Sequence, residues 1–221
     1  MGRLLVMEGL DGSGKATQTK LLAEALSGQG KTVRQVSFPD YNSDASAPVR
    51  MYLSGAFGTR PGDVNAYAAS SFYAVDRYAS YRRDWGGFYQ AGGIVVADRY
   101  TTSNAVHQCS KLPRKDWDAF LDWLFSYEYK LLGLPAPDTV FYLRVDPAIS
   151  ERLLQGRQQR TGERADIHEQ DREYQARSRE AADYCAARYA WKAVECGRGG
   201  ELRSAEEIHR EILREISHVF S

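Results

Sequence analysis

The sequence predicts an α/β protein with a mostly parallel, five-stranded sheet that is covered by helices on both faces. Three observations support this fold class. Short apolar segments alternate with longer segments of helical spacing along the whole chain, which is the pattern of a parallel sheet. Glycine or proline residues bound most of the apolar segments, and a glycine-rich turn follows the first of them. We expect residues 1–221 to form a single domain.

Five short apolar segments are the predicted strands. They cover residues 4–7, 32–38, 94–97, 139–145 and 191–196, of which the last is the weakest. Between them lie segments with helical spacing, at 15–26, 64–85, 115–132 and 169–189. A last helix begins after Ser204, which forms a capping box with Glu207. The residues that recur every four positions on one face of this helix are Ile208, Ile212, Ile216 and Phe220.

Charge and composition argue against several functional classes. The chain has 29 Lys and Arg and 29 Asp and Glu residues, whereas proteins held to nucleic acid mainly through phosphates usually carry a basic excess. No apolar run approaches the roughly 20 residues that a membrane-spanning helix needs. The widely spaced cysteines, Cys109, Cys185 and Cys196, indicate reduced, buried thiols and a cytoplasmic protein.

A phosphate-binding loop follows the first predicted strand. Residues 9–17 read G-L-D-G-S-G-K-A-T, which matches the pattern G-x-x-x-x-G-K. Glycines let backbone N–H groups curl around a polyphosphate, the next helix adds its positive end, and the lysine neutralises charge. The motif predicts a P-loop NTPase-type fold whose ATP site comprises Gly9, Gly12, Ser13, Gly14, Lys15, Ala16 and Thr17.

The residue after the lysine departs from the usual motif. A serine or threonine hydroxyl at that position normally binds Mg²⁺, and Ala16 has no such group. The candidates to hold the metal instead are Thr17, a water molecule, or the carboxylates of Asp11 and Asp98. The same alanine leaves open a regulatory protein that binds a nucleotide without catalysing transfer.

A carboxylate and an arginine directly follow the third predicted strand. Because ligands of parallel sheets bind at the carboxyl ends of the strands, Asp98 and Arg99 are expected beside the phosphate loop. The carboxylate can hold a metal or its waters, and the guanidinium can bridge phosphate oxygens. Taken alone, the two residues are also compatible with a structural ion pair.

In this order the motifs resemble the thymidylate kinase family of nucleoside monophosphate kinases. That family carries an E-G-x-D-G-x-G-K loop, a Phe-Pro turn after the second strand, and a helix with an aromatic residue four positions before an arginine. A D-R-Y motif, Ser-Asn and a Pro-Asp before the fourth strand complete the set. The corresponding residues here are 8–15, Phe38 and Pro39, Tyr73 and Arg77, 98–104, and Pro137 and Asp138. The resemblance spans residues 4 to about 170.

The resemblance implies roles for the side chains at the phosphate end of the site. Lys15 is expected to bind the donor phosphates and Arg99 the acceptor phosphate. Asp11 would face the 3′-hydroxyl of the sugar and contribute to the metal site. Tyr41 and Ser103, which adjoin these motifs, belong to the expected substrate site.

The resemblance also implies a pocket for a flat, neutral base. Phe38 and Tyr73 would frame the thymine ring, with Tyr73 stacking on it. Arg77 would reach a base carbonyl, and Asn104 would contact the edge of the base. An aromatic face with a few polar contacts is what such a ligand requires, although core packing is the default for Tyr73 considered alone.

Two positions depart from the family's pattern. Many members have an arginine after Phe-Pro, but this chain has Asp40 and Tyr41, so Arg50 is the candidate for a second phosphate contact. Relatives often carry a tyrosine that crowds the sugar, where this chain has His107. The choice between deoxyribose and ribose is therefore open, as is the choice among pyrimidine bases.

An arginine-rich polar segment, residues 155–168, is expected to form a lid. It contains Arg157, Arg160 and Arg164, while the phosphate loop has Gly12 where some family members place an arginine. Relatives with glycine at that position supply arginine from the lid. Closure of the lid would bring guanidinium groups over the reacting phosphates.

The implied activity is the phosphorylation of dTMP to dTDP with ATP as donor and Mg²⁺ as cofactor. The acceptor phosphate is largely dianionic at pH 7, so transfer needs alignment and charge neutralisation but no general base. A deoxynucleoside kinase is the alternative enzyme, with Asp40 as the base for a 5′-hydroxyl. Nucleotides are the expected partners, and the aromatic-rich segment 67–85 offers a face for a homodimer.

Overall fold

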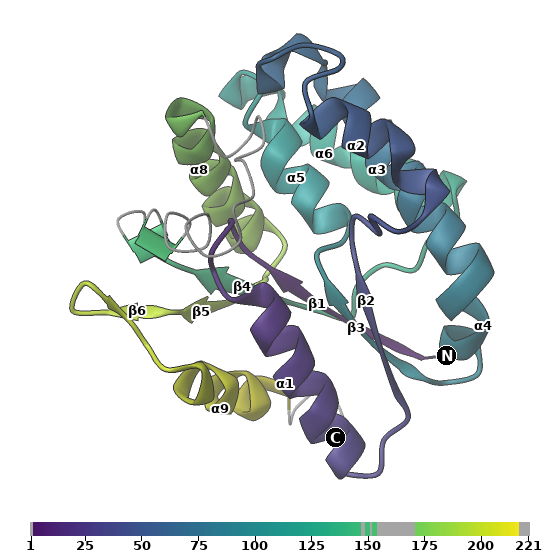
Figure 1. The fold of residues 1–221 in the computed structure, drawn as a ribbon, viewed down its shortest axis with the longest axis vertical. Helices are drawn as coiled ribbons and strands as arrows, with labels where there is room; N and C mark the ends of the chain where they lie inside the picture. Colours follow the sequence, from purple (N-terminus) through teal and green to yellow (C-terminus); the bar gives the residue numbers. More distant parts are fainter. Residues whose placement is uncertain (1, 147–148, 151, 154–170, 217–221) are drawn as a thin grey trace.

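The computed structural model describes residues 2–146, 149–150, 152–153 and 171–216 (Figure 1). Its centre is a five-stranded sheet in the order β2-β3-β1-β4-β5, in which every neighbouring pair is parallel. The strands are β1, Arg3–Glu8; β2, Val33–Ser37; β3, Ile94–Asp98; β4, Thr139–Arg144; and β5, Lys192–Glu195. The predicted fold class and all five predicted strands are thereby confirmed.

Helices cover both faces of the sheet, as Figure 1 shows. One face packs against α1, Lys15–Gly28, and α9, Ala205–Ile216; the other packs against α5, Thr101–Cys109, α6, Trp117–Phe125, and α8, Arg172–Arg188. Side chains of β1 alternate between these layers, since Leu4 and Val6 lie in one buried cluster and Leu5 and Met7 in the other. Both faces of the central strand are therefore core, which explains its unbroken apolar sequence.

The ladder between β1 and β3 brings two loops of the chain together. Met7 is paired with Asp98, and the N–H of Arg99 donates to the Met7 carbonyl at 3.0 Å. The residues that follow Met7 lead into the glycine-rich loop, and Arg99 follows β3 directly. The loop and Arg99 therefore leave the sheet side by side at its carboxyl edge.

Two segments predicted as single helices are interrupted. Segment 64–85 contains α3, Ala66–Ser80, and then a π-helical turn, Tyr81–Trp85, which leads into α4, Gly86–Gln90. Trp85 is fully buried in that turn, with its ring centroid 4.8 Å from that of Tyr81. Segment 115–132 likewise divides into α6 and a π-helical turn, Ser126–Leu131. Each π-helical turn carries one buried residue, Trp85 in the first and Glu128 in the second.

Several short elements were absent from the prediction. They are α2, Ala47–Leu53, α5, Thr101–Cys109, and a hairpin of β6, Gly197–Arg198, with β7, Glu201–Leu202. Helix α5 begins with β-branched residues, which have low intrinsic helix propensity, and its polar side chains hide the helical pattern. Its buried face is stabilised by contacts with α3, α6 and α8, which a local pattern does not reveal.

Two smaller predictions are confirmed. In the capping box, the Ser204 N–H donates to Glu207 Oε2 at 3.1 Å and the Glu207 N–H donates to Ser204 Oγ at 3.2 Å. The isoleucines at 208, 212 and 216 are buried, while Phe220 lies outside the described residues. All three cysteines are buried free thiols. Among the described residues, no helix is long and apolar enough to cross a membrane.

A half-buried lysine follows α5. The Lys111 ammonium donates to the carbonyl of Val64 at 3.2 Å and lies 4.7 Å from the centroid of the Tyr52 ring. Burial disfavours the charged form and lowers the pKa of Lys111 to about 7. In the unfolded chain, Lys111 has the ordinary lysine pKa of about 10.4. At pH values between the two pKa values, Lys111 is therefore mostly protonated in the unfolded chain and mostly deprotonated in the native protein. The contribution of Lys111 to the free energy of unfolding therefore rises with pH across that window.

Replacing Lys111 with methionine should remove this pH dependence. We expect the unfolding free energy of the native chain, relative to Lys111→Met, to increase by about 1 kcal/mol per pH unit between pH 7.5 and pH 9.5. Urea unfolding of both proteins across that range measures the difference. Lys115→Met, at an exposed lysine nearby, is the control. Its unfolding free energy should depend on pH as that of the native protein does. If the unfolding free energies of Lys111→Met and the native protein changed with pH in the same way, Lys111 would be charged in the native protein.

Candidate active site

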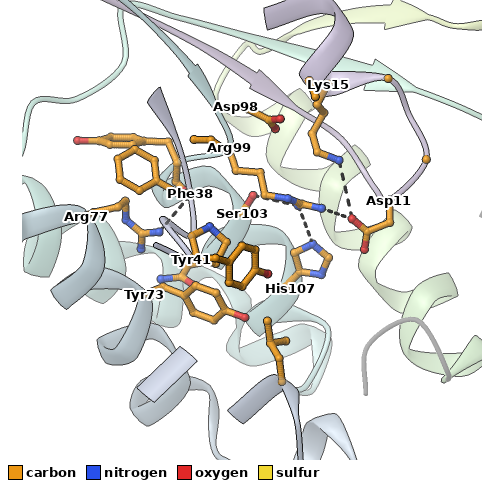
Figure 2. A pocket seen from close by; sticks show the side chains of 18 of the residues that line it. Asp11, Lys15, Phe38, Tyr41, Tyr73, Arg77, Asp98, Arg99, Ser103 and His107 are labelled. Carbon is orange, nitrogen blue, oxygen red and sulfur yellow. Dashed lines mark hydrogen bonds and ion pairs between the residues drawn. The ribbon is translucent and has the colours of Figure 1, made fainter. Parts of the chain in front are cut away.

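A pocket of about 690 Å³ opens at the carboxyl edge of the sheet (Figure 2). The glycine-rich loop after β1, the residues after β2 and β3, and helices α3 and α5 form its walls. Its lining includes most of the expected site residues, namely Asp11, Gly12, Gly14, Lys15, Ala16, Thr17, Phe38, Tyr41, Tyr73, Arg77, Asp98, Arg99, Ser103, Asn104 and His107. The expectation that Asp98 and Arg99 lie beside the loop is confirmed.

The glycine-rich loop has the backbone that its sequence requires. Gly14 has a φ of 86°, in the left-handed region, and stands at the N-cap of α1. A Cβ on Gly9 would lie 2.5 Å from Ser13 Oγ and 2.9 Å from the Leu143 carbonyl, so only glycine fits there. Within the loop, Gly9 and Ser13 are buried and do not line the pocket. The loop thus presents its inner edge and the start of α1 to a ligand.

Lys15 is a buried cation at the start of α1. Its Nζ donates to the Leu10 carbonyl at 2.8 Å and lies 3.9 Å from Asp11 Oδ1. Burial, followed by the positive charge of Arg99, lowers the pKa of Lys15 to about 8, against the opposing effect of Asp11. An anionic ligand in the pocket would favour the charged ammonium, which is the requirement for binding a polyphosphate.

Arg99 connects the loop to α5. Its backbone has a φ of 65°, a left-handed conformation that is uncommon for a residue with a side chain. Its guanidinium forms an ion pair with Asp11, and Nη1 lies 3.3 Å from both Ser103 Oγ and His107 Nε2. Burial opposes the charge, but nearby carboxylates, first Asp11, hold the pKa of Arg99 above its usual range. Arg99 is therefore a fixed positive charge facing the pocket.

Glu8 anchors the N-terminal part of α5 beneath this cluster. It ends β1, is fully buried, and accepts hydrogen bonds from Thr102 Oγ1 at 2.6 Å and Ser103 Oγ at 2.8 Å. It also lies 3.8 Å from Arg99 Nη1. Sequence reasoning used Glu8 only as part of a motif. A carboxylate directly after the apolar run 4–7 was the signal that Glu8 has a supporting role.

The opposite end of the pocket is aromatic. Phe38 is buried, with its ring centroid 5.8 Å from that of Tyr100, and Tyr73 on α3 is half-buried at the same end. Asn104 on α5 and Arg77 on α3 add polar groups to this wall. The backbone between Phe38 and Pro39 is cis. A flat ring with hydrogen-bonding edges fits this combination of surfaces.

Arg50 lies in a different environment from the one expected, whereas His107 lies where it was expected. Arg50 does not line the pocket: its Nη1 donates to the carbonyls of Tyr41 at 3.1 Å and Ser43 at 2.8 Å. It thus holds the loop that carries Tyr41, whose side chain is 55% exposed at the pocket. His107 does line the pocket, and its ring stacks on Tyr174 of α8 with centroids 6.0 Å apart.

Other lining residues were absent from the sequence-based set. They are Ser37, Pro39, Leu53, Tyr100 and Gln108. Ser37 and Pro39 flank Phe38 in sequence, and Gln108 follows His107, so proximity to recognised motifs was their signal. Leu53 belongs to α2, which was not predicted, so nothing local indicated it. The lid residues Arg157, Arg160 and Arg164 lie outside the described part of the chain.

Few side-chain oxygens lie near the loop, which suits a cation that is bound mainly by substrate phosphates and water. Asp11 and Asp98 line the pocket with Thr17, whereas Ala16 offers no side-chain oxygen. Within the described residues, no group of three or more His, Cys, Asp or Glu side chains could enclose a metal ion. Mg²⁺ is usually bound by one or two carboxylates, several waters and substrate phosphates, so this sparse donor set is compatible with it.

Three comparisons with known proteins agree with one another. A family model described as Thymidylate kinase matches residues 7–212. A thymidylate kinase from Mycobacterium tuberculosis is 32% identical over 177 residues, which cover 79% of this chain and 81% of that protein. Another from Plasmodium falciparum is 26% identical, over 99% of this chain and 91% of that protein. A solved structure of thymidylate kinase from Candida albicans has a TM-score of 0.73 at 21% identity, over 98% of this chain and 92% of that one.

Proposed function

The chain belongs to the thymidylate kinase family, and we propose that it transfers the γ-phosphoryl group of ATP to dTMP, giving dTDP. One observation carries this proposal beyond family membership. A phosphate loop with Lys15 and a fixed cation, Arg99, face the same pocket, and the other end of that pocket is lined by aromatic side chains. The phosphate end would hold the phosphate groups of both nucleotides, and the aromatic end would hold the base of the acceptor.

The phosphate loop is the proposed donor site. Backbone N–H groups of the loop and the N-terminus of α1 would bind the ATP phosphates, and Lys15 would neutralise their charge. The acceptor phosphate of dTMP is largely dianionic at pH 7 and attacks without a general base. Catalysis then consists of aligning two polyanions and offsetting their repulsion.

Arg99 and its neighbours are the proposed acceptor site. The guanidinium would bind the dTMP phosphate, and Asp11, which already pairs with it, would face the sugar 3′-hydroxyl. Phe38 and Tyr73 would enclose the thymine ring, with Arg77 and Asn104 at its polar edge. Ser103 and Tyr41 would contribute to the wall and the mouth of this site. His107 lines the sugar side, where it would affect the choice between deoxyribose and ribose.

Asp11, Asp98 and Thr17 are the proposed residues around Mg²⁺. When bound, the metal would neutralise negative charge on the transferring phosphates. Asp11 would then link the metal site to Arg99, because its carboxylate already contacts the guanidinium. We also propose a cytoplasmic location.

A panel of nucleoside monophosphates tests the function directly. With ATP and Mg²⁺, a coupled assay of ADP release should show turnover with dTMP well above background. Thymidine in place of dTMP distinguishes a deoxynucleoside kinase, which would use it as acceptor. ATP binding by calorimetry without transfer to any monophosphate would instead identify a nucleotide-binding regulator. Either of those results would overturn the proposal.

A homodimer through α3 is the proposed assembly. Tyr67, Val75 and Tyr78 of this helix are 43%, 50% and 40% exposed, so the helix presents apolar surface to the outside. Trp85, at the end of segment 67–85, is buried and does not contribute to this surface. Light scattering that gave the mass of one chain would contradict the dimer.

A further inference from the structure

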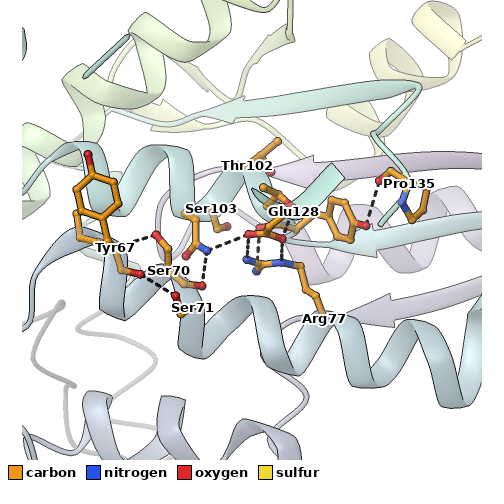
Figure 3. Close-up of polar contacts among 12 residues, drawn as sticks. Tyr67, Ser70, Ser71, Arg77, Thr102, Ser103, Glu128 and Pro135 are labelled. Atoms are coloured by element: carbon orange, nitrogen blue, oxygen red, sulfur yellow. Dashed lines mark hydrogen bonds and ion pairs between the residues drawn. The ribbon is translucent and has the colours of Figure 1, made fainter. Parts of the chain in front are cut away.

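A buried carboxylate lies directly behind the polar edge of the base pocket. Glu128 is fully buried in the π-helical turn after α6, and the pocket lining does not include it. Its carboxylate accepts hydrogen bonds from Arg77 Nε at 2.7 Å and Nη2 at 2.6 Å, and from Thr101 Oγ1 at 2.7 Å (Figure 3). Asn104 Nδ2 donates to the same carboxylate at 3.3 Å. Both polar residues of the base pocket therefore share one acceptor.

Glu128 lies on the buried face of the helix, where its charge must be paired. It continues the apolar stripe of α6, since Leu121 and Leu124 lie on the same helical face and are fully buried. A carboxylate on such a face is costly unless it is paired and fully hydrogen-bonded. Its pairing with Arg77 meets that requirement, because a guanidinium and a carboxylate form two parallel hydrogen bonds.

Glu128 determines the orientation of the Arg77 guanidinium. Burial disfavours the charge on Arg77, but Glu128 outweighs that effect and holds the pKa of Arg77 above its usual value. The carboxylate occupies the edge formed by Nε and Nη2, and Nη1 donates to the Tyr100 carbonyl at 3.4 Å. A guanidinium has five N–H groups, so Arg77 can also donate to a ligand in the pocket that it lines.

Glu128 also fixes which end of the Asn104 amide faces the pocket. Asn104 Nδ2 lies between two acceptors, the Ser70 carbonyl at 3.1 Å and Glu128 Oε1 at 3.3 Å. Both hydrogens of the amide are thereby directed away from the pocket. The Oδ1 atom, an acceptor, is the end that remains for a ligand.

We propose that Glu128 is a positioning residue that makes the pocket selective for 4-keto over 4-amino pyrimidine nucleotides. The inference rests on the proposed function, because it takes Arg77 and Asn104 as the groups that meet the base. Arg77 presents a donor and Asn104 presents an acceptor. Thymine offers the complement, an acceptor at O4 and an N–H at N3, whereas cytosine offers a donor at N4 and an acceptor at N3. Cytosine would therefore leave buried polar groups unpaired.

Glu128→Gln tests this role with an almost isosteric side chain. Both Glu128 oxygens accept from Arg77, so the amide N–H group of the glutamine faces a guanidinium donor in either orientation. If that group takes the place of Oε1, it also faces Asn104 Nδ2, and the present orientations of both side chains lose their support. We expect the ratio of kcat/KM for dTMP to kcat/KM for dCMP to fall at least tenfold, with the KM for ATP unchanged within about twofold. Asp122→Asn removes an exposed carboxylate from the adjoining helix α6 and should leave the ratio unchanged.

A role in stability alone would give a different result. Loss of folded protein lowers the turnover of both substrates by the same factor and leaves their ratio at the native value, and that outcome would overturn the proposal. Glu128→Asp keeps the charge but withdraws the carboxylate by one methylene, so its ratio should lie between those of the native and Gln proteins. If Glu128→Gln does not fold, Glu128→Asp provides the test. A ratio of kcat/KM for dTMP to kcat/KM for dCMP in Glu128→Asp equal to that of the native protein would then overturn the proposal.

Nucleoside binding separates this inference from the proposed kinase activity. Calorimetric titration with thymidine and with deoxycytidine measures base preference without phosphoryl transfer. Should the native protein phosphorylate neither monophosphate, the proposed activity fails, while a loss of thymidine preference in Glu128→Gln would still support the positioning role. Equal preference in the native and variant proteins would refute the positioning role whatever the activity.

Discussion

Arg99→Met is expected to lower kcat/KM for dTMP by about 30- to 140-fold. Removing a charged hydrogen-bonding group costs roughly 2–3 kcal/mol, and each 1.4 kcal/mol is about tenfold in rate. Methionine keeps much of the side-chain length but loses the charge that faces the pocket and the pairing with Asp11. Both the KM for dTMP and kcat should change, because the arginine is proposed to bind the acceptor phosphate in the ground state and in the transition state.

Steady-state kinetics with dTMP varied at saturating ATP measures this effect. Arg144→Met is the matched control, because Arg144 is an exposed arginine at the end of β4 whose ion pairs are with Asp183 and Glu195. Near-native kinetics for Arg99→Met would mean that Arg99 is only structural. Thermal unfolding of both variants should accompany the assay, so that a loss of fold is not mistaken for a loss of chemistry.

Lys15→Met is expected to reduce kcat by about 100- to 1000-fold. The ammonium lies at the start of α1, where the donor phosphates are proposed to bind, and loss of one donor to developing charge costs this much in other active sites. Its native contacts within the loop, to Leu10 and Asp11, are few, so the fold should persist. The affinity for thymidine should change little, because the aromatic end of the pocket is built from other segments.

Single-turnover transfer from ATP to dTMP measures the chemical step for this variant. Lys20→Met, an exposed lysine on the same helix that pairs with Glu24, is the control and should keep native kinetics. Thymidine titration supplies the second readout. A variant that lost thymidine affinity as severely as turnover would indicate that Lys15 stabilises the whole pocket rather than the donor phosphates.

Most of the sheet and the phosphate end of the site could be predicted from the sequence. Strand segments such as 94–97 are short, apolar and bounded by glycine, and the glycine-rich turn has few backbone conformations available. Arg99 could be placed beside the turn because parallel strands end at a common edge. These inferences use local patterns and a topological rule, and both are contained in the sequence.

Features that depend on contacts between distant segments could not be predicted. Glu128 lies 51 positions from Arg77, and nothing in either local sequence indicates that they meet. Helix α5 looked like a polar stretch because its buried residues, such as Thr102, satisfy a carboxylate at the end of β1. Arg50 was predicted to contact a phosphate because the sequence shows its charge. The sequence does not show that its guanidinium donates to the carbonyls of Tyr41 and Ser43.

The pairing of β1 with β3 links the geometry of transfer to the packing of the core. Met7 and Asp98 are paired in one ladder, so the loop that leads to Lys15 and the residue Arg99 leave the sheet from adjacent positions. Adjacent residues of a strand are about 3.3 Å apart, which is close to the whole separation of reacting atoms before transfer. Substitutions at buried positions such as Val6 or Val96 that tilt one strand against the other would therefore shift the phosphate loop relative to Arg99, although no polar residue of the site is replaced.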